Sequence, residues 1–306
     1  MNFRIRVPAT SANIGPGFDA MGVALSLYNS FEVKSADRTT VSGCEARFAN
    51  DDNLFLQSLR SACKKLDIQV PNLGLSIDAH IPLARGLGSS AAMIVGGVAA
   101  AFLFAGKGAR GFSLEDKRGI FEISAALEGH PDNAGPAVFG GFCSSILKEG
   151  EDGGAFYSTC TVDPSWHFHA LVPPFELSTG KARAALPDLV PRKDAVFNLG
   201  RAALVALAFF SRKPELLGAA CEDRLHQDYR APLISGYDEI AGLCRKHARA
   251  VWLSGAGPTI MALSASDEQG LAFAKNLDPF LASRQEGAWN RLTLISDSIG
   301  LTTEVF

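Results

Sequence analysis

The stretch Pro82–Ala92, with the sequence PLARGLGSSAA, constrains the fold of this chain more than any other. Gly86 and Gly88 allow a positive φ or a close approach of the backbone to a ligand. Ser89 and Ser90 then begin a helix of small residues, whose first N–H groups lack partners within the helix. Those groups and the helix dipole suit an anion such as phosphate. The stretch therefore predicts an anion-binding loop between a strand and a helix, although a serine-capped turn without a ligand has the same pattern.

Composition and charge narrow the class of protein. The chain has 306 residues, 47% of them hydrophobic and 20% charged, which is typical of a globular protein with room for two domains. The formal net charge is −3, and no Lys/Arg cluster occurs, so we expect no nucleic-acid partner. A phosphate group would have to be bound by local structure.

Cysteine usage and hydropathy indicate the compartment. The six cysteines form neither a C-x-x-C pair nor a zinc-site spacing, which predicts free thiols in a reducing cytosol. The N-terminal residues MNFRIRVPAT lack the apolar core of a signal peptide. The apolar run Ala91–Ala105 is too short to span a bilayer and predicts a buried helix. We therefore expect a cytoplasmic protein without a membrane partner.

Hydrophobic periodicity predicts mixed elements in the first half. A strand over 3–7 ends at Pro8, and the glycine-rich segment 8–22 fits neither period. A polar loop is expected over 128–141 and a solvated hairpin over 148–154. Ser113 and Asp116 resemble a capping box. The other expected elements are strands over 24–36, 39–43, 73–79, 142–147 and 156–162, and helices over 53–66, from 89 onward and over 114–127.

The second half continues the mixture. The elements expected there are strands over 167–173, 250–253, 259–263 and 292–295, a short helix within 177–187, helices over 194–210, 214–227 and 234–247, and one more helix before the last strand. Because no regular βαβ repeat occurs, this order predicts α+β layers. We expect two domains, residues 1–160 and 161–306. His167 and His169 would share a strand face and are interpreted as structural, since two ligands do not make a metal site.

Several common nucleotide-binding signatures are absent. The chain lacks GxxxxGK[ST], HRD and DFG, and no G-x-G-x-x-G follows a strand, which excludes P-loop, protein-kinase and Rossmann patterns. It has instead three glycine-containing turns, SANIGPGFD, GLGSSAA and SGAGPT. Each turn could be structural by itself.

Taken together and in this order, these turns resemble the three motifs of the GHMP small-molecule kinases. Within that superfamily, the sequence is most similar to the homoserine kinases. The similar segments span nearly the whole chain: PATSANIGPGFDAMGVAL at 8–25, PLARGLGSSAA at 82–92, HPDN at 130–133, STGKARAALP at 178–187, LHQDYRAPLI at 225–234 and LSGAGPTI at 253–260.

The resemblance implies a fold and a reaction. The N-terminal domain would be ribosomal S5 domain 2-like and the C-terminal domain ferredoxin-like, with ATP in the cleft between them. The enzyme would transfer phosphate from ATP to L-homoserine in threonine biosynthesis, with Mg²⁺, and would form a homodimer. Two rival hypotheses remain, a GHMP kinase with another acceptor and a non-catalytic nucleotide-binding protein.

The nucleotide side follows from chemistry and resemblance together. Phosphoryl transfer needs charge neutralisation, so a Mg²⁺ site is expected at Ser90 and Glu122. The family has a metal-binding glutamate eight residues before its HPDN histidine, where Glu122 stands, although an isolated Glu is usually solvated. Asn53 would otherwise be a helix N-cap, and Arg85 could face nucleotide or solvent. The expected ATP-binding residues are Asn53, Leu54, Pro82, Leu83, Ala84, Arg85, Gly86, Leu87, Gly88, Ser89, Ser90, Ala91 and Ala92.

The acceptor side must bind a zwitterion, which requires cations at its carboxylate. Arg183 and Arg230 match the carboxylate-binding arginines of the family. Asn13 and Asp19 match residues that contact the amine and hydroxyl ends. Thr179 and His130 are further expected substrate contacts. Surface arginines and turn-capping Asx residues are the ordinary alternatives.

The proton acceptor stays open at this stage. Asn133 stands where mevalonate-type relatives have an aspartate, and an amide cannot accept the hydroxyl proton. The γ-phosphate or water would then take the proton while Asn13 and Asn133 orient the hydroxyl. His130 as the base is the alternative.

Overall fold

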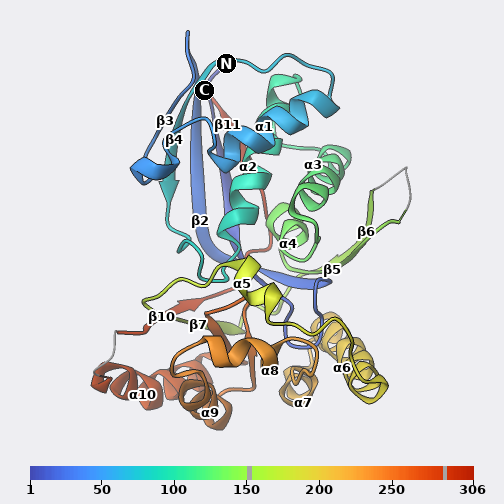
Figure 1. The fold of residues 1–306 in the computed structure, drawn as a ribbon, viewed down its shortest axis with the longest axis vertical. Helices are drawn as coiled ribbons and strands as arrows, with labels where there is room; N and C mark the ends of the chain where they lie inside the picture. Colours follow the sequence, from blue (N-terminus) through green and yellow to red (C-terminus); the bar gives the residue numbers. More distant parts are fainter. Residues whose placement is uncertain (150–153, 285–287) are drawn as a thin grey trace.

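The computed structural model describes residues 1–149, 154–284 and 288–306. Its first sheet is built on the antiparallel pair β1 (Phe3–Ala12) and β2 (Met21–Ser35) (Figure 1). The predicted end of the first strand at Pro8 is wrong, because β1 continues to Ala12. The register shifts between Pro8 and Ala9, and such an irregularity accommodates a residue without an N–H group.

Five further strands complete this sheet, which has the order β11-β1-β2-β4-β3, with β5 paired to β2 and to β6. They are β3 (Thr40–Ser42), β4 (Leu73–Ala79), β5 (Phe142–Leu147), β6 (Ala155–Cys160) and β11 (Thr302–Val305). Strand β11 is not predicted from the sequence, because its TTEV segment lacks apolar alternation. The predicted hairpin 148–154 lies partly outside the described residues.

Helices cover one face of this sheet: α1 (Leu54–Lys65), α2 (Ser89–Phe104), α3 (Leu114–Glu128) and α4 (Ala134–Phe139), after the short 3-10 helix η1 (Ala46–Phe48). The predicted buried helix is confirmed as α2. Its Gly97 lies so close to α1 that a Cβ atom there would be 2.2 Å from the Phe55 carbonyl oxygen. The capping box of Ser113 and Asp116 is confirmed at the start of α3.

Helix α4 corrects the predicted loop 128–141. Its sequence AGPAVF contains a glycine and a proline, which have low helix propensity. Five of its six residues are buried. Packing against the sheet therefore overrides the local preference.

The second sheet is antiparallel, with the order β10-β7-β9-β8. Its strands are β7 (His167–Val172), β8 (Ala250–Leu253), β9 (Ile260–Ser264) and β10 (Asn290–Leu294). Helices α9 (Tyr237–His247) and α10 (Asp267–Ser283) pack on it through a separate hydrophobic cluster that contains Ile240, Phe273 and Leu277. The structure thus confirms the predicted α+β class.

The remaining helices are α5 (Thr179–Ala184), α6 (Arg192–Ser211), η2 (Pro214–Leu216), α7 (Leu217–Ala220), α8 (Gln227–Arg230) and η3 (Ala231–Leu233). The predicted single helix over 214–227 is wrong. The Asp223 carboxylate accepts hydrogen bonds from the backbone N–H groups of Leu225, His226 and Gln227. Side chains that bind nearby amides in this way compete with a continuous helix.

Helix α6 is, by length and composition, apolar enough to cross a membrane, and 22% of its most apolar stretch is buried inside the protein. Its outward side chains include Val196, Leu199 and Leu207, which are exposed. A single such helix is weak evidence for a membrane span, because helices of soluble proteins pass the same test. The absence of a membrane partner stays a prediction.

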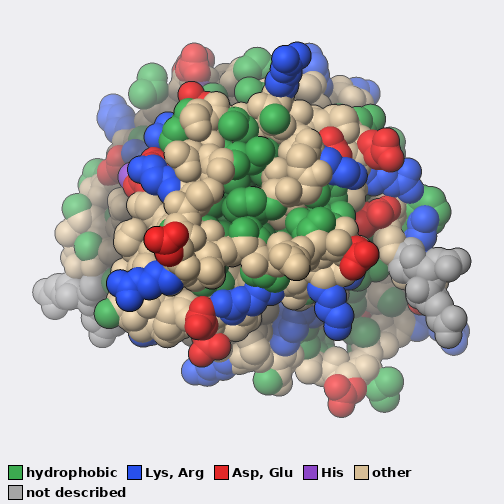
Figure 2. All heavy atoms as spheres, turned by 90° about the horizontal axis from the view of Figure 1, so that it is seen from above, with side chains coloured by type: hydrophobic (Ala, Val, Ile, Leu, Met, Phe, Trp, Pro, Cys, Tyr) green, Lys and Arg blue, Asp and Glu red, His purple; other side chains and the backbone are tan. Residues whose placement is uncertain are grey.

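The two halves of the chain share structure. Strand β11, at the end of the chain, pairs with β1 in the first sheet. The larger hydrophobic cluster joins residues of both sheets, among them Phe31 and Trp252. Figure 2 shows the end of the molecule that holds both termini, where charged side chains of both signs surround a central group of hydrophobic ones. The division into residues 1–160 and 161–306 stays a prediction.

Candidate active site

A cavity of about 960 Å³ lies where the two halves of the chain meet. Its walls come from the β1–β2 loop, the glycine loop before α2, the end of α3, helices α5 and α8, and the turn after β8. Side chains that are distant in sequence therefore share one cavity. This volume is in the range of known small-molecule binding sites.

The glycine loop has the conformation that its sequence predicts. Gly86 and Gly88 have φ values of 75° and 72°, and α2 begins at Ser89. A Cβ atom on Gly88 would lie 2.0 Å from Oγ1 of Thr10, and one on Gly86 would lie 2.3 Å from the carbonyl oxygen of Ser254. Only glycine fits at these two positions. The first amides of α2 therefore lie at the wall of the cavity, where an anion can approach.

The expected ATP-binding residues fall into two groups. Those that line the cavity are Asn53, Leu54, Pro82, Leu83, Ala84, Gly86, Gly88, Ser89 and Ser90. Those that do not line it are Arg85, Leu87, Ala91 and Ala92. The last three are buried in the hydrophobic core, because they lie on the face of the loop and of α2 that packs inward. Asn53 is also the N-cap of α1, since its Oδ1 accepts from the Phe55 N–H at 3.0 Å.

The Arg85 guanidinium does not line the cavity and is mostly shielded from solvent. Its nitrogens donate to the carbonyl oxygens of Leu83, Pro173 and Pro174 at 3.0 to 3.1 Å. The side chain is 16% exposed and lies 3.7 Å from the Glu176 carboxylate. Arg85 therefore ties the glycine loop to the segment after β7.

Glu122, expected as a metal ligand, is absent from the cavity wall. Its carboxylate accepts a hydrogen bond from Arg118 Nε at 3.2 Å, one turn earlier on α3. Glu128, at the end of α3, lines the cavity instead. Six residues along an α-helix amount to a rotation of about 240°, so Glu122 and Glu128 leave the helix on different sides. The role of Glu122 as a metal ligand stays a prediction, and Glu128 is the carboxylate of α3 that lines the cavity.

The Glu128 carboxyl group is electrostatically unusual. Its Oε2 is buried and has no hydrogen-bond partner among the described residues. Burial raises the pKa of Glu128 to about 8; the charge of His130 opposes this rise and that of Asp132 adds to it. As the last residue of α3, Glu128 also faces the negative end of the helix dipole. A carboxylate at the end of a helix is the sequence signal that could have identified it.

The HPDN segment forms a hydrogen-bonded chain at the cavity wall. His130 Nδ1 lies 2.6 Å from Asp132 Oδ1, and Asn133 Nδ2 donates to the same oxygen at 3.2 Å. Thr10 Oγ1 donates to Asn133 Oδ1 at 2.7 Å. Asp132 is 2% exposed and was missed by the sequence analysis, although it adjoins Asn133.

The protonation state of His130 argues against its role as a base. Burial alone would lower its pKa, but the hydrogen bond and the charge of Asp132 outweigh burial and raise the pKa to about 9. His130 is therefore a cation at neutral pH and already carries its proton. Ligand atoms of Asp19, His130 and Asp132 lie within 4.8 Å of one another, but the Asp19 carboxylate already pairs with Arg183, and Asp132 Oδ1 already pairs with His130.

The predicted zwitterion contacts lie together. Arg183 donates to both carboxylate oxygens of Asp19, at 2.7 and 3.0 Å. Arg230, which is 1% exposed, and Thr179 line the same cavity. Asn13 accepts from the Asp19 N–H at 3.0 Å and donates to the Gly255 carbonyl oxygen at 2.8 Å. This part of the wall thus presents one carboxylate and two guanidinium groups.

His167 and His169 lie on β7, outside the cavity. His167 Nε2 is 2.6 Å from Asp267 Oδ1. His169 stacks on Phe273 at 4.5 Å and contacts the Ser264 and Thr293 hydroxyl groups. Both histidines have partners in the second sheet or on α10, in agreement with their structural interpretation.

Comparisons with known proteins agree with this geometry. Residues 53–141 match the family model of the GHMP kinases N terminal domain, and residues 203–279 match that of GHMP kinases C terminal. A homoserine kinase of Clostridium botulinum (strain Kyoto / Type A2) is 41% identical over 298 residues, which cover 97% of this chain and 96% of that protein. A homoserine kinase of Clostridium beijerinckii is 40% identical over 301 residues, covering 97% of each.

Solved structures give the same result. A putative homoserine kinase from Listeria monocytogenes superposes with a TM-score of 0.78 at 29% identity, covering 99% of this chain and 100% of that one. The homoserine kinase from Cytophaga hutchinsonii gives 0.81 at 25% identity, with 99% and 97% covered. The predicted two-domain fold is confirmed at the level of this family. The chain belongs to the GHMP kinases and, within them, to the homoserine kinase family.

Proposed function

We propose that this protein transfers the γ-phosphoryl group of ATP to the hydroxyl group of L-homoserine, giving ADP and O-phospho-L-homoserine. The observation that carries the proposal is the Asp19–Arg183 ion pair, with Arg230, in the cavity that also contains the glycine loop. A zwitterionic amino acid can insert into such a pair. Its ammonium group would bind Asp19, and its carboxylate would bind Arg183 and Arg230.

The hydroxyl group of the acceptor would lie toward the HPDN segment. The amide nitrogens of Asn13 and Asn133 each carry two hydrogens, and the structure uses one of each within the protein. The second hydrogen can orient a hydroxyl oxygen. Because His130 is protonated, we propose that the γ-phosphate or water accepts the hydroxyl proton, while His130 and Asp132 fix the position of Asn133.

The residues present fit a divalent cation with ATP. We propose Ser90 and Glu128 as its ligands, in place of Ser90 and Glu122, because both line the cavity and Oε2 of Glu128 lacks a partner among the described residues. The carboxyl group is largely protonated at neutral pH in the ligand-free protein, so a bound cation would displace this proton. When bound, Mg²⁺ would neutralise charge on the transferred phosphate.

The decisive experiment is a coupled ADP-release assay with homoserine, mevalonate, galactose, serine and threonine as acceptors. Turnover with homoserine well above the others is expected. Preference for another acceptor would support a different GHMP kinase. Binding of Mg-ATP without turnover of any acceptor would support the non-catalytic alternative.

A matched pair of variants tests the metal proposal. Glu128→Gln should raise the Mg²⁺ concentration for half-maximal activity at least tenfold, because it removes the proposed ligand. Glu122→Gln, on the same helix, should change it less than twofold. Magnesium titrations of the kinase rate measure both values. An equal response of the two variants would contradict the assignment of Glu128.

The homodimer, the cytoplasmic location and the absence of nucleic-acid and membrane partners remain predictions.

A further inference from the structure

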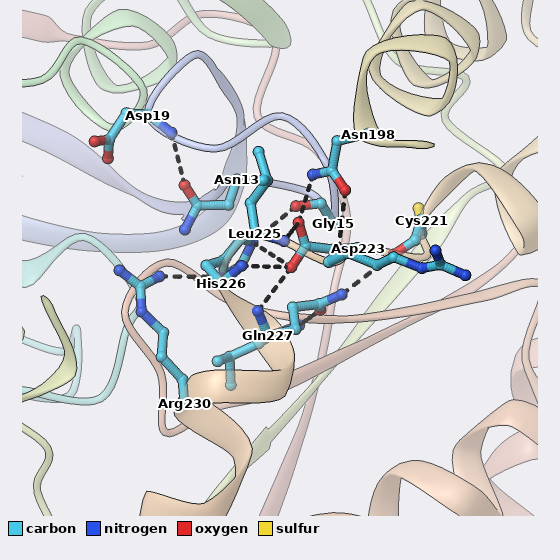
Figure 3. A network of polar contacts seen from close by, with 12 residues as sticks. Asn13, Gly15, Asp19, Asn198, Cys221, Asp223, Leu225, His226, Gln227 and Arg230 are labelled. Carbon is cyan, nitrogen blue, oxygen red and sulfur yellow. Dashed lines mark hydrogen bonds and ion pairs between the residues drawn. The ribbon is translucent and has the colours of Figure 1, made fainter. Parts of the chain in front are cut away.

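A buried polar network lies behind the acceptor side of the cavity (Figure 3). It begins at Asp223, between α7 and α8, whose carboxylate accepts from the N–H groups of Leu225, His226 and Gln227 at 2.7 to 3.0 Å. Asn198 of α6 adds a fourth bond through Nδ2 at 2.6 Å. These four donors fix the backbone at the start of α8 and so fix the side chain of His226.

The two ring nitrogens of His226 have partners of opposite kind. Nε2 lies 2.8 Å from the carbonyl oxygen of Gly15, which can only accept a hydrogen bond. Nδ1 lies 3.2 Å from Nη1 of Arg230, which can only donate. The ring is therefore neutral, with its hydrogen on Nε2. Burial lowers the pKa of His226, Asp223 opposes this, and the charge of Arg230 lowers it further.

Through these contacts His226 joins two parts of the acceptor site. Its bond to Gly15 and its stacking on Phe18, at 5.2 Å, hold the loop that carries Asp19. Its bond to Arg230 holds the guanidinium that faces the cavity. Gly15 itself is tightly packed, since a Cβ atom there would lie 2.3 Å from the Cys221 carbonyl oxygen.

The other bonds of Arg230 leave one nitrogen for a ligand. Nη1 also donates to the Gly255 carbonyl oxygen at 3.2 Å, and Nε donates to that of Ala182 at 3.4 Å. Nη2 has no hydrogen bond to the part of the chain that the structure describes. The contacts of Nη1 and Nε thus set the direction in which Nη2 points. Two of the three acceptors in these contacts are backbone carbonyl oxygens, and the third is Nδ1 of His226.

We propose that His226 is a positioning residue for the carboxylate of the acceptor: it holds the Arg230 guanidinium and the Asp19 loop in one arrangement. The proposal rests on the proposed function and deepens it. The acceptor class it implies is an α-amino acid, bound between Arg230 and Asp19. His226 contacts the protein alone, so it acts on substrate through Arg230.

The test compares His226→Phe with His226→Asn. Phenylalanine retains the stacking on Phe18 and loses both hydrogen bonds, whereas the Oδ1 atom of asparagine can replace Nδ1 as the acceptor for Arg230. His226→Phe should raise the KM of homoserine roughly thirtyfold, as expected for a lost hydrogen bond to a charged group. His226→Asn should recover most of this loss. The KM of ATP and kcat should change less than twofold in both variants.

Controls separate positioning from folding. His169→Phe removes another buried, stacked histidine, outside the cavity, and should leave both KM values unchanged. A merely structural role of His226 would lower the active fraction, and hence kcat, without a selective rise in the KM of homoserine. That result, or equal KM values for the two His226 variants, would overturn the proposal.

Nitrogen-15 NMR of the wild-type protein provides a test that does not depend on folding of the variants. The His226 ring should remain the neutral Nε2–H tautomer from pH 6 to pH 8. An Nδ1–H tautomer or a doubly protonated ring would overturn the proposal. If the wild-type protein does not phosphorylate homoserine, the proposed function fails instead, and the NMR result still decides the state of His226.

Discussion

The two sides of the cavity are built in different ways. The proposed phosphate side comes mainly from one continuous stretch, Pro82–Ser90, whose backbone conformation and helix start form the proposed anion site. The proposed acceptor side brings together residues around 13–19, 128–133 and 179–183 with Arg230, and these are distant in sequence. A site made by local backbone geometry can be identified from its sequence. A site made by side chains that meet across the fold cannot be placed in this way.

The two sides also differ in what stabilises them. Glycines that only just fit against Thr10 and Ser254 hold the phosphate loop. Charged and polar side chains, such as the Asp19–Arg183 pair and the Asp223–His226–Arg230 network, hold the acceptor side. Steric changes should therefore damage the first side most, and changes of charge the second.

The largest effect is expected at the phosphate loop. Gly88→Ala should lower kcat/KM for ATP roughly a thousandfold, because its Cβ would clash with Thr10 Oγ1 at 2.0 Å and displace the loop. Gly106→Ala is the matched control, since Gly106 has a similar φ of 78° and a Cβ atom there would meet nothing within 4 Å. Steady-state kinetics with varied ATP measures both. A similar loss in Gly106→Ala would mean that replacing a positive-φ glycine, and not the clash with Thr10, lowers the activity.

The next effect is expected on the acceptor side. Arg183→Ala should raise the KM of homoserine about fiftyfold and leave the KM of ATP within threefold, because it removes a carboxylate partner and leaves Asp19 unpaired.

Arg85→Ala is the control from the phosphate loop. Its guanidinium contacts only protein, so both KM values should stay within twofold while the free energy of unfolding falls by about 2 kcal/mol. A large rise in the KM of ATP for Arg85→Ala would place its guanidinium at the nucleotide.

The smallest predicted effect is a pH-dependent change in the free energy of unfolding. The pKa of His130 is raised to about 9 in the folded protein, so its contribution to stability is fully present below pH 6.5 and is lost as the pH rises through 9. In the ligand-free protein, the difference in unfolding free energy between wild type and His130→Gln should fall by about 2 kcal/mol from pH 6.5 to pH 9. Urea titrations at each pH measure this difference.

His169 supplies a control of opposite sign. Burial lowers the pKa of His169 to about 4, and the charge of Arg291 lowers it further. The contribution of His169 to stability is therefore present above pH 6.5 and is lost as the pH falls toward 4. The difference in unfolding free energy between wild type and His169→Phe should not change between pH 6.5 and pH 9. If the stability difference from wild type fell with rising pH for both the His130 and the His169 variants, the fall could not be assigned to the ion pair of His130 with Asp132.

The errors of the sequence analysis have physical causes. Periodicity correctly placed α1, α2, α3 and most strands, because each buries one continuous face. It failed at residues 214–227, where the Asp223 carboxylate takes the amides that a helix would need. It also failed at α4, where burial compensates for a glycine and a proline in the helix.

The site residues divide in the same way. The glycine loop, the two arginines and Asp19 line the cavity as expected, whereas Glu122 does not line it and Glu128 does. Counting residues back from a motif cannot tell which turn of a helix faces a cavity. Asp132 and His226 were missed because their importance lies in the partners that the fold brings to them.

The sequence by itself determined the conformation of the glycine loop, the α+β class and the kinds of side chain that a zwitterionic acceptor would require. Those properties depend on backbone preferences and on chemistry carried by contiguous residues. The tertiary structure decided which carboxylate of α3 lines the cavity, which partners His130 and His226 have, and that the Arg85 guanidinium bonds to backbone carbonyl oxygens. These outcomes depend on burial and on charges brought together from distant segments, and no local pattern records them.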